Sequence, residues 1–207
     1  MIFLRNPRQS AQCILPVVRA PRLTIAALAA LLSSACLVVS LQPVYEPETI
    51  AFDPALLGAW VAADDDMSVS FERAEWHSYR VTIAERDDTS RLTARLTRVG
   101  EQLYLDVSPL DGADVAPLLL PVHGVYRVAL HDDELSLADL NYERLERLAR
   151  EGTAGLPMTI DARKNVVITA STAELRRWLV THAADEGMFA APTVLRRKAV
   201  SDSPTPR

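Results

Sequence analysis

The chain of 207 residues has only two cysteines and seven glycines. Two cysteines are too few for a disulfide-stapled miniprotein or a zinc ribbon. Seven glycines exclude a collagen and leave little material for the glycine-rich loops that hold phosphates. The remaining composition is ordinary, with 49% hydrophobic and 24% charged residues, so a wholly disordered acidic chain is also excluded. The sequence therefore predicts one globular domain with an appendage.

Negative charge is missing from the first 35 residues, which contain four arginines and no acidic residue. Since the whole chain has 22 basic and 27 acidic residues, the rest of it holds 18 basic and 27 acidic residues, a net charge of -9. Such an acidic body disfavours nucleic acid as a partner. Its one basic cluster, Arg196-Arg197-Lys198, lies near the end of the chain and is interpreted as a solvated flank.

The segment from Leu23 reads LTIAALAALLSSAC, an apolar stretch that follows the arginines and ends in small residues. A basic region, a short apolar region and a small-residue processing site are typical of a secretory signal, so residues 1–35 are predicted to be a signal peptide. The alternative is an uncleaved anchor helix, because Leu23–Leu41 is a 19-residue stretch without charge, close to the length that spans a bilayer.

The signal ends in Ser33-Ser34-Ala35-Cys36, which resembles the bacterial lipobox. Ser34 and Ala35 fit that pattern, whereas Ser33 stands where leucine is usual. The resemblance implies cleavage before Cys36, acylation of its thiol, and membership of the small lipoproteins of bacterial envelopes. Multiple acyl chains would hold the chain firmly at the outer membrane or at the outer face of the inner membrane. Acylation would also account for a lone thiol in an exported chain.

Three further segments follow from the composition. Residues 36–50, with Pro43 and Pro47, are predicted to be a lipidated, extended tether that holds the domain away from the bilayer. Residues 51–198 are predicted to form the β-rich globular domain, and residues 199–207 a disordered tail.

Hydrophobic residues alternate with polar ones through most of the domain, most clearly at Leu92, Ala94 and Leu96. This spacing predicts antiparallel strands joined by polar hairpin turns, a meander of about seven to nine strands that forms a partial or closed barrel. The pattern then changes to a helical period after Tyr142 and again after the capping box Ser171–Glu174. The predicted fold class is α+β, dominated by strands, with two late α-helices. A last edge strand is predicted at Thr193–Arg197.

A helical turn at Asp53-Pro54 precedes Gly58-Ala59-Trp60 at the start of the first strand. This arrangement resembles the G-x-W pattern of the lipocalins and calycins. The resemblance implies that Trp60 closes one end of an antiparallel barrel and that an arginine from a late strand, Arg127 or Arg196, covers it. It also implies a barrel interior that holds a lipid or another hydrophobic molecule.

Sequence motifs for chemistry are few. No nucleophile elbow, P-loop, dinucleotide fingerprint or H-E-x-x-H occurs in the sequence. The run Asp64–Asp66 lacks the spacing of a calcium loop, and the four histidines match no zinc spacing. No catalytic residue, metal ligand or cofactor is therefore predicted, and no ligand-binding residue can be named. The histidines are His77, His123, His131 and His182.

Three functions are compatible with these features. The leading hypothesis is a non-enzymatic, membrane-anchored domain of the cell envelope that binds a protein or an apolar small molecule. The first alternative is a lipocalin-like carrier of a hydrophobic ligand, which needs an enclosed apolar pocket of about 300 Å³ or more. The second is an envelope hydrolase that uses Asp or Glu, because the separation of two carboxylates is a property of the fold. A protein-binding module instead needs a large exposed apolar patch.

We expect Cys36→Ser to release the protein into the soluble envelope fraction or to stall its processing, because serine cannot carry the thioether-linked lipid. Fractionation of cells and the mass of the mature protein measure both outcomes. Unchanged membrane retention together with unchanged mass would contradict the lipid anchor.

Overall fold

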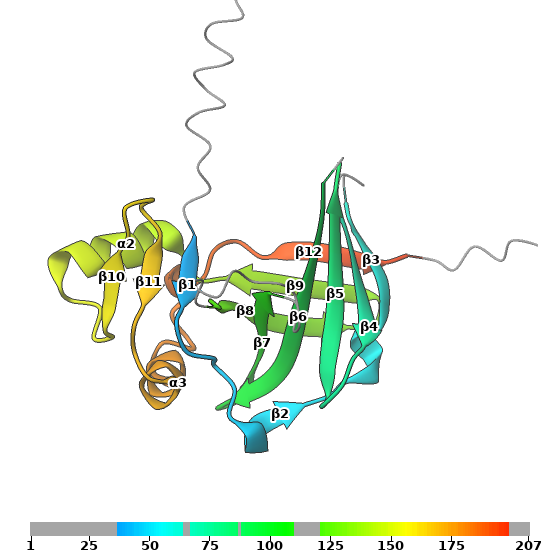
Figure 1. Ribbon diagram of the computed structural model, residues 1–207, viewed down its shortest axis with the longest axis horizontal. Helices are drawn as coiled ribbons and strands as arrows, with labels where there is room; N and C mark the ends of the chain where they lie inside the picture. Colours follow the sequence, from blue (N-terminus) through cyan, green and yellow to red (C-terminus); the bar gives the residue numbers. More distant parts are fainter. Residues whose placement is uncertain (1–36, 64–66, 87, 110–120, 199–207) are drawn as a thin grey trace, which may run out of the picture. The chain divides into compact units, whose positions relative to one another are not determined.

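The computed structural model describes residues 37–63, 67–86, 88–109 and 121–198 (Figure 1). Within these residues eight strands form a closed antiparallel barrel in the order β6-β5-β4-β3-β12-β9-β8-β7, and β7 pairs with β6 to close the ring. The predicted β-dominated fold with two late helices is therefore confirmed. The barrel strands are β3 (Gly58–Ala62), β4 (Met67–Arg73), β5 (Ser78–Glu85), β6 (Asp88–Val99), β7 (Gln102–Pro109), β8 (Gly124–His131), β9 (Glu134–Asp139) and β12 (Thr193–Arg197).

The alternation seen in the sequence sets the inner face of the barrel. On β6, Ala94 and Leu96 pack in the interior core, whereas Arg95 between them lies over the ring of Tyr45. Successive residues of a strand point to opposite faces, so the register in which a strand pairs with its neighbours determines which of its side chains point inward. The barrel interior is consequently a core of aliphatic and aromatic side chains drawn from all eight strands.

The last strand differs from its prediction. Thr193–Arg197 does not lie at an edge, because β12 pairs antiparallel with β3 on one side and with β9 on the other. Leu195, at the middle of the strand, is fully buried in the barrel core. Without β12 both β3 and β9 would have an open edge, and closing a barrel removes such edges. Figure 1 shows β12 crossing the molecule between these two strands.

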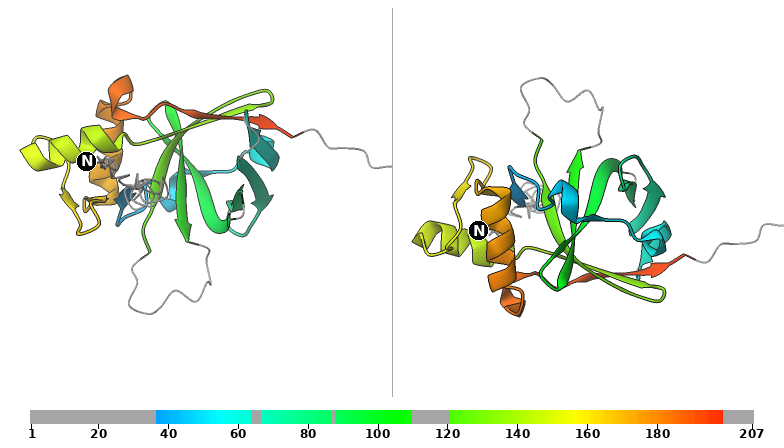
Figure 2. Two further views of the ribbon diagram at one scale, coloured as in Figure 1. Left: turned by 90° about the horizontal axis from the view of Figure 1, so that it is seen from above. Right: turned by 90° about the horizontal axis from the view of Figure 1, so that it is seen from below.

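A smaller layer of helices and strands covers one side of the barrel (Figure 2). It contains α2 (Tyr142–Glu151), α3 (Thr172–Thr181) and a three-stranded sheet in the order β1-β11-β10. The helices are capped as the sequence indicates, because α2 ends at Gly152 with a positive φ of 67° and α3 begins with the capping box. None of the described helices is long and apolar enough to cross a bilayer. The strands are β1 (Val38–Ser40), β10 (Met158–Ile160) and β11 (Val166–Ile168).

A second hydrophobic core joins this layer to the outer face of the barrel. Tyr104 and Val125 belong to β7 and β8 but pack with Trp178 and Leu179 of α3 and with Phe189. The strands β7, β8 and β9 are therefore buried on both faces, inward against the barrel core and outward against the helices. Burial on both faces explains why this part of the chain is more continuously apolar than β4 or β5.

Residues 38–50 are folded into the domain, which corrects the predicted tether. β1 pairs in parallel with β11, and Val44 is fully buried. A short 3-10 helix, Pro47–Thr49, then leads into β2 (Ile50–Ala51), which pairs with the end of β6. The prolines lie where the chain turns between these contacts, so they do not indicate a free linker. The predicted signal peptide, Cys36, the run Asp64–Asp66 and the predicted tail lie outside the described residues.

Trp60 fills the end of the barrel at which the chain enters β3. Its side chain is fully buried, and its indole Nε1 donates a hydrogen bond of 2.9 Å to the carbonyl oxygen of Leu56. Leu56 belongs to the 3-10 helix Pro54–Leu56, whose first turn is capped by the Asp53 carboxylate, as the sequence predicts. This helix therefore forms a lid that is bonded directly to the tryptophan beneath it.

Arg197 of β12 covers Trp60, with its guanidinium carbon 4.2 Å from the ring centroid. The predicted candidates do not. Arg196 is the neighbour of Arg197 and lies on the outer face of β12 because side chains alternate along a strand, and Arg127 lies 4.2 Å over the ring of Phe189. The Arg197 guanidinium also donates to the carbonyl oxygens of Leu57 at 2.9 Å and Ala55 at 2.7 Å.

We expect Arg197→Met to lower the free energy of unfolding by about 2 to 3 kcal/mol, because it removes a cation–π contact and three hydrogen bonds from a charged donor, the third of them to Oδ1 of Asp133 at 3.0 Å. Arg196→Met is the matched control, since that side chain is exposed one residue away, and its effect should stay within about 0.5 kcal/mol. Urea denaturation measures both variants. Equal stability of the two would refute the assigned role of Arg197.

Candidate ligand-binding site

The barrel contains an apolar cavity of about 180 Å³ that is partly open to solvent. Its wall is built almost entirely from inward residues of the barrel strands, and three polar residues, Tyr126, Asp139 and Thr193, complete it. The apolar lining consists of Met67, Val69, Phe71, Val81, Ile83, Leu92, Leu105, Val107, Leu137 and Leu195.

The cavity arises because side-chain size is unequal along the barrel. The end at which Trp60 lies is filled by large rings, since Tyr79 stacks on Phe52 at a centroid distance of 4.9 Å and meets Phe71 edge-on at 6.0 Å. Farther along the same strands the inward positions carry smaller valines such as Val69 and Val81. Branched aliphatic side chains cannot reach across the space that an aromatic ring fills, so a void remains.

Tyr126 and Asp139 are cross-strand partners on β8 and β9, and both line the cavity. Burial is the main cause that raises the pKa of the Tyr126 phenol, and the nearby negative charge of Asp139 raises that pKa further. The phenol therefore keeps its proton at neutral pH and remains a hydrogen-bond donor. The cavity thus combines an apolar body with a small polar end.

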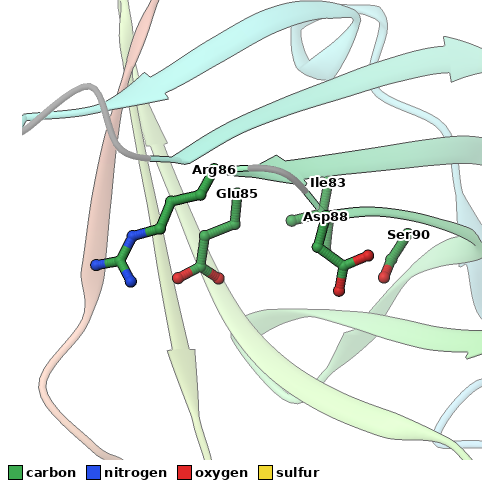
Figure 3. Close-up of a pocket in the computed structure, with 5 residues that line it drawn as sticks. All are labelled: Ile83, Glu85, Arg86, Asp88 and Ser90. Carbon is green, nitrogen blue, oxygen red and sulfur yellow. The ribbon is translucent and has the colours of Figure 1, made fainter.

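A second hollow of about 490 Å³ lies on the β5–β6 hairpin (Figure 3) and is lined by Ile83, Glu85, Arg86, Asp88 and Ser90. It shares Ile83 with the barrel cavity. Glu85 pairs with Asp88 across the hairpin, and Ile83 pairs with Ser90. Because alternation places these four residues on the inner side of the strands, the polar hollow continues the barrel interior toward its mouth.

Asp106 and His123 form a close pair on the outside of the barrel. The Asp106 side chain is fully buried, and its Oδ1 lies 2.7 Å from Nδ1 of His123. Its Oδ2 accepts a hydrogen bond of 2.8 Å from the backbone amide of Val44. Neither residue lines the barrel cavity. The pair fastens the segment around Val44 to β7, so its contacts assign it a role in the fold and give no support to a hydrolase.

The remaining histidines are dispersed. His77 lies 6.3 Å from the ring of Phe52 at the β4–β5 turn, His131 is exposed at the end of β8, and His182 ends α3 with its ring 4.6 Å from that of Trp178. Over the described ranges, no three His, Cys, Asp or Glu side chains gather closely enough to hold a metal ion.

Exposed large apolar side chains occur on four separate parts of the described chain. They are Leu37 before β1, Trp76 in the β4–β5 turn, Val180 on α3 and Val194 on β12. A protein-binding module needs contiguous apolar surface of a few hundred Å², and single side chains on four different elements do not supply it. The interior cavity is the stronger candidate for a binding site.

None of the cavity residues was named as a ligand contact from the sequence. Their inward direction is readable from the alternation, but a void depends on which side chains face one another across the barrel. Comparisons with protein-family models, with curated proteins and with solved structures find no match for this chain. The barrel and its cavity are therefore the features from which a function can be inferred.

Proposed function

We propose that this chain is an exported, lipid-anchored protein of the bacterial cell envelope whose barrel binds a small apolar ligand without chemical turnover. The observation that carries the proposal is the apolar cavity of about 180 Å³. The lipobox-like Ser33–Cys36 segment supports the anchor, and the G-x-W tryptophan with Arg197 over its ring supports the lipocalin-like interpretation.

The volume of the cavity limits the size of the ligand. Pockets for drug-sized molecules hold at least about 300 Å³, so the cavity by itself is too small to enclose a long acyl chain. An engineered cavity of about 150 Å³ lined by aliphatic and aromatic side chains binds benzene. The barrel therefore suits a ligand the size of one ring, and this narrows the carrier hypothesis from lipids to small hydrophobic molecules.

The charges at the mouth favour some ligands over others. Glu85, Asp88 and Arg86 line the outer hollow, and Asp139 lines the cavity itself, so three carboxylates face this region against one arginine. These carboxylates repel an anionic head group, which disfavours free fatty acids independently of their size. The Tyr126 phenol offers a donor to an acceptor atom on the ligand. A neutral or cationic single-ring compound satisfies both conditions.

The test is binding of fluorobenzene, followed by 19F NMR of the purified protein. We expect saturable binding to the wild type and at least a tenfold weaker affinity for Val107→Phe, because the larger ring occupies the cavity. Filling a true void adds buried contacts and is stabilising, whereas overpacking a filled core costs about 1 to 3 kcal/mol. Val107→Phe should therefore be at least as stable as the wild type.

The matched control is Val194→Phe, which makes the same change at an exposed position on the outside of β12. It should bind fluorobenzene like the wild type. Palmitate in excess should not displace the probe. Absence of saturable binding to the wild type, or equal binding to both variants, would overturn the proposed site.

A further inference from the structure

Leu37, the residue after the predicted lipid-bearing cysteine, is hydrogen-bonded to the folded domain. The backbone amide of Leu37 donates to Oδ1 of Asn165 at 3.1 Å, and the carbonyl oxygen of Leu37 accepts from the amide of Val166 at 2.9 Å. Consecutive Cα atoms are about 3.8 Å apart. A lipid on Cys36 would thus be attached to the domain without a linker, so the surface next to Leu37 must meet the lipid headgroups.

The turn between β10 and β11, Asp161–Asn165, makes up this surface together with Leu37. Arg163 and Lys164 are both exposed on the turn, whereas the Asp161 carboxylate is directed into it. That carboxylate accepts hydrogen bonds from the amides of Arg163 and Asn165, each at 2.8 Å, and from the Asn165 side chain at 2.9 Å. These bonds, the one from the Asn165 side chain first, lower the pKa of Asp161.

The turn is held in place from a second side. The Tyr142 hydroxyl, at the start of α2, donates to the carbonyl oxygen of Lys164 at 2.8 Å. Glu146 on this helix accepts a bond of 2.6 Å from Arg150. That bond is the main cause that lowers the Glu146 pKa, and the charge of Lys164 lowers it further. The turn therefore presents two cations in a fixed position beside Leu37.

We propose that the Asp161–Asn165 turn rests on anionic phospholipid headgroups and fixes the orientation of the lipid-anchored domain. This inference depends on the proposed anchor at Cys36. The chain after residue 35 has a net charge of -9, so an anionic bilayer repels most of the domain and attracts this basic turn. Arg163 and Lys164, offset by the ionised Asp161, leave the turn a net charge of +1, which favours the turn-down orientation about fivefold near such a surface.

The test uses the processed, lipidated protein in vesicles of phosphatidylethanolamine and phosphatidylglycerol. Ala162→Cys carries a fluorophore on the turn, and Glu75→Cys carries it on the β4–β5 turn, which lies at the far end of the domain from β1 (Figures 1 and 2). An acylated Cys36 leaves the mature chain without another thiol, so each label is unique. A spin-labelled headgroup lipid should quench the label at 162 at least about threefold more than the label at 75.

A charge-reversal pair tests the cause of this orientation. Arg163→Glu with Lys164→Glu should reduce quenching at 162 to the level at 75, while the protein still sediments with the vesicles. Arg196→Glu with Lys198→Glu, exposed at the end of β12, is the matched control and should leave quenching unchanged.

The outcomes separate the two proposals. A mature protein whose mass lacks the lipid would refute the anchor and with it this inference. A lipidated, sedimenting protein with equal quenching at the two positions would overturn the orientation and leave the anchor intact. Equal behaviour of the two charge-reversal variants would also overturn the role of the basic turn.

Discussion

The pairing of β12 with both β3 and β9 is the contact on which the rest of the structure depends. Three successive inward residues of this strand serve two purposes. Thr193 and Leu195 form part of the cavity wall, and Arg197 covers Trp60 at the closed end. Removal of the strand would leave two open edges, an uncovered tryptophan and a cavity without one side. The closure of the barrel, the packing of its end around Trp60 and the wall of the cavity thus all depend on the register in which β12 pairs with β3 and β9.

The alternation of side chains along β7 and β8 also explains how the helical layer is held against the barrel. Inward residues of β7 and β8 build the barrel core, and outward residues of these strands, such as Tyr104, build the second core with α3. Asp106 also faces outward on β7, where it binds the amide of Val44 and the His123 ring. Leaving the buried Asp106 carboxylate without these partners would cost several kcal/mol. Asp106 therefore fastens the segment around Val44 to the barrel and keeps Leu37 close to the β10–β11 turn.

Much of the architecture could be predicted from local patterns, because alternation and helix caps involve neighbours in the chain. The predictions that proved wrong depend on distant partners. Arg196 and Arg197 are adjacent in sequence, and only the pairing of Arg197 with Trp60 across β12 and β3 decides which faces inward. Residues 36–50 were predicted to be a tether because they contain Pro43 and Pro47. Local composition does not reveal the partner of β1, since β11 lies more than a hundred residues away. The cavity was not predicted because its existence depends on which side chains face one another across the barrel, and the sequence does not show this.

The cavity also limits the strength of the binding that we propose. Destabilisation grows by about 24 cal/mol for each Å³ of closed void in a core. For a partly open pocket of about 180 Å³, about 4 kcal/mol is therefore an upper bound. A ligand that fills it can recover at most a contribution of that order, about a thousandfold in affinity. Valines at positions such as Val69 and Val81 therefore keep the barrel less stable than a filled one, while Trp60 and Arg197 secure the opposite end. Stability and binding capacity are thus located at different ends of one barrel.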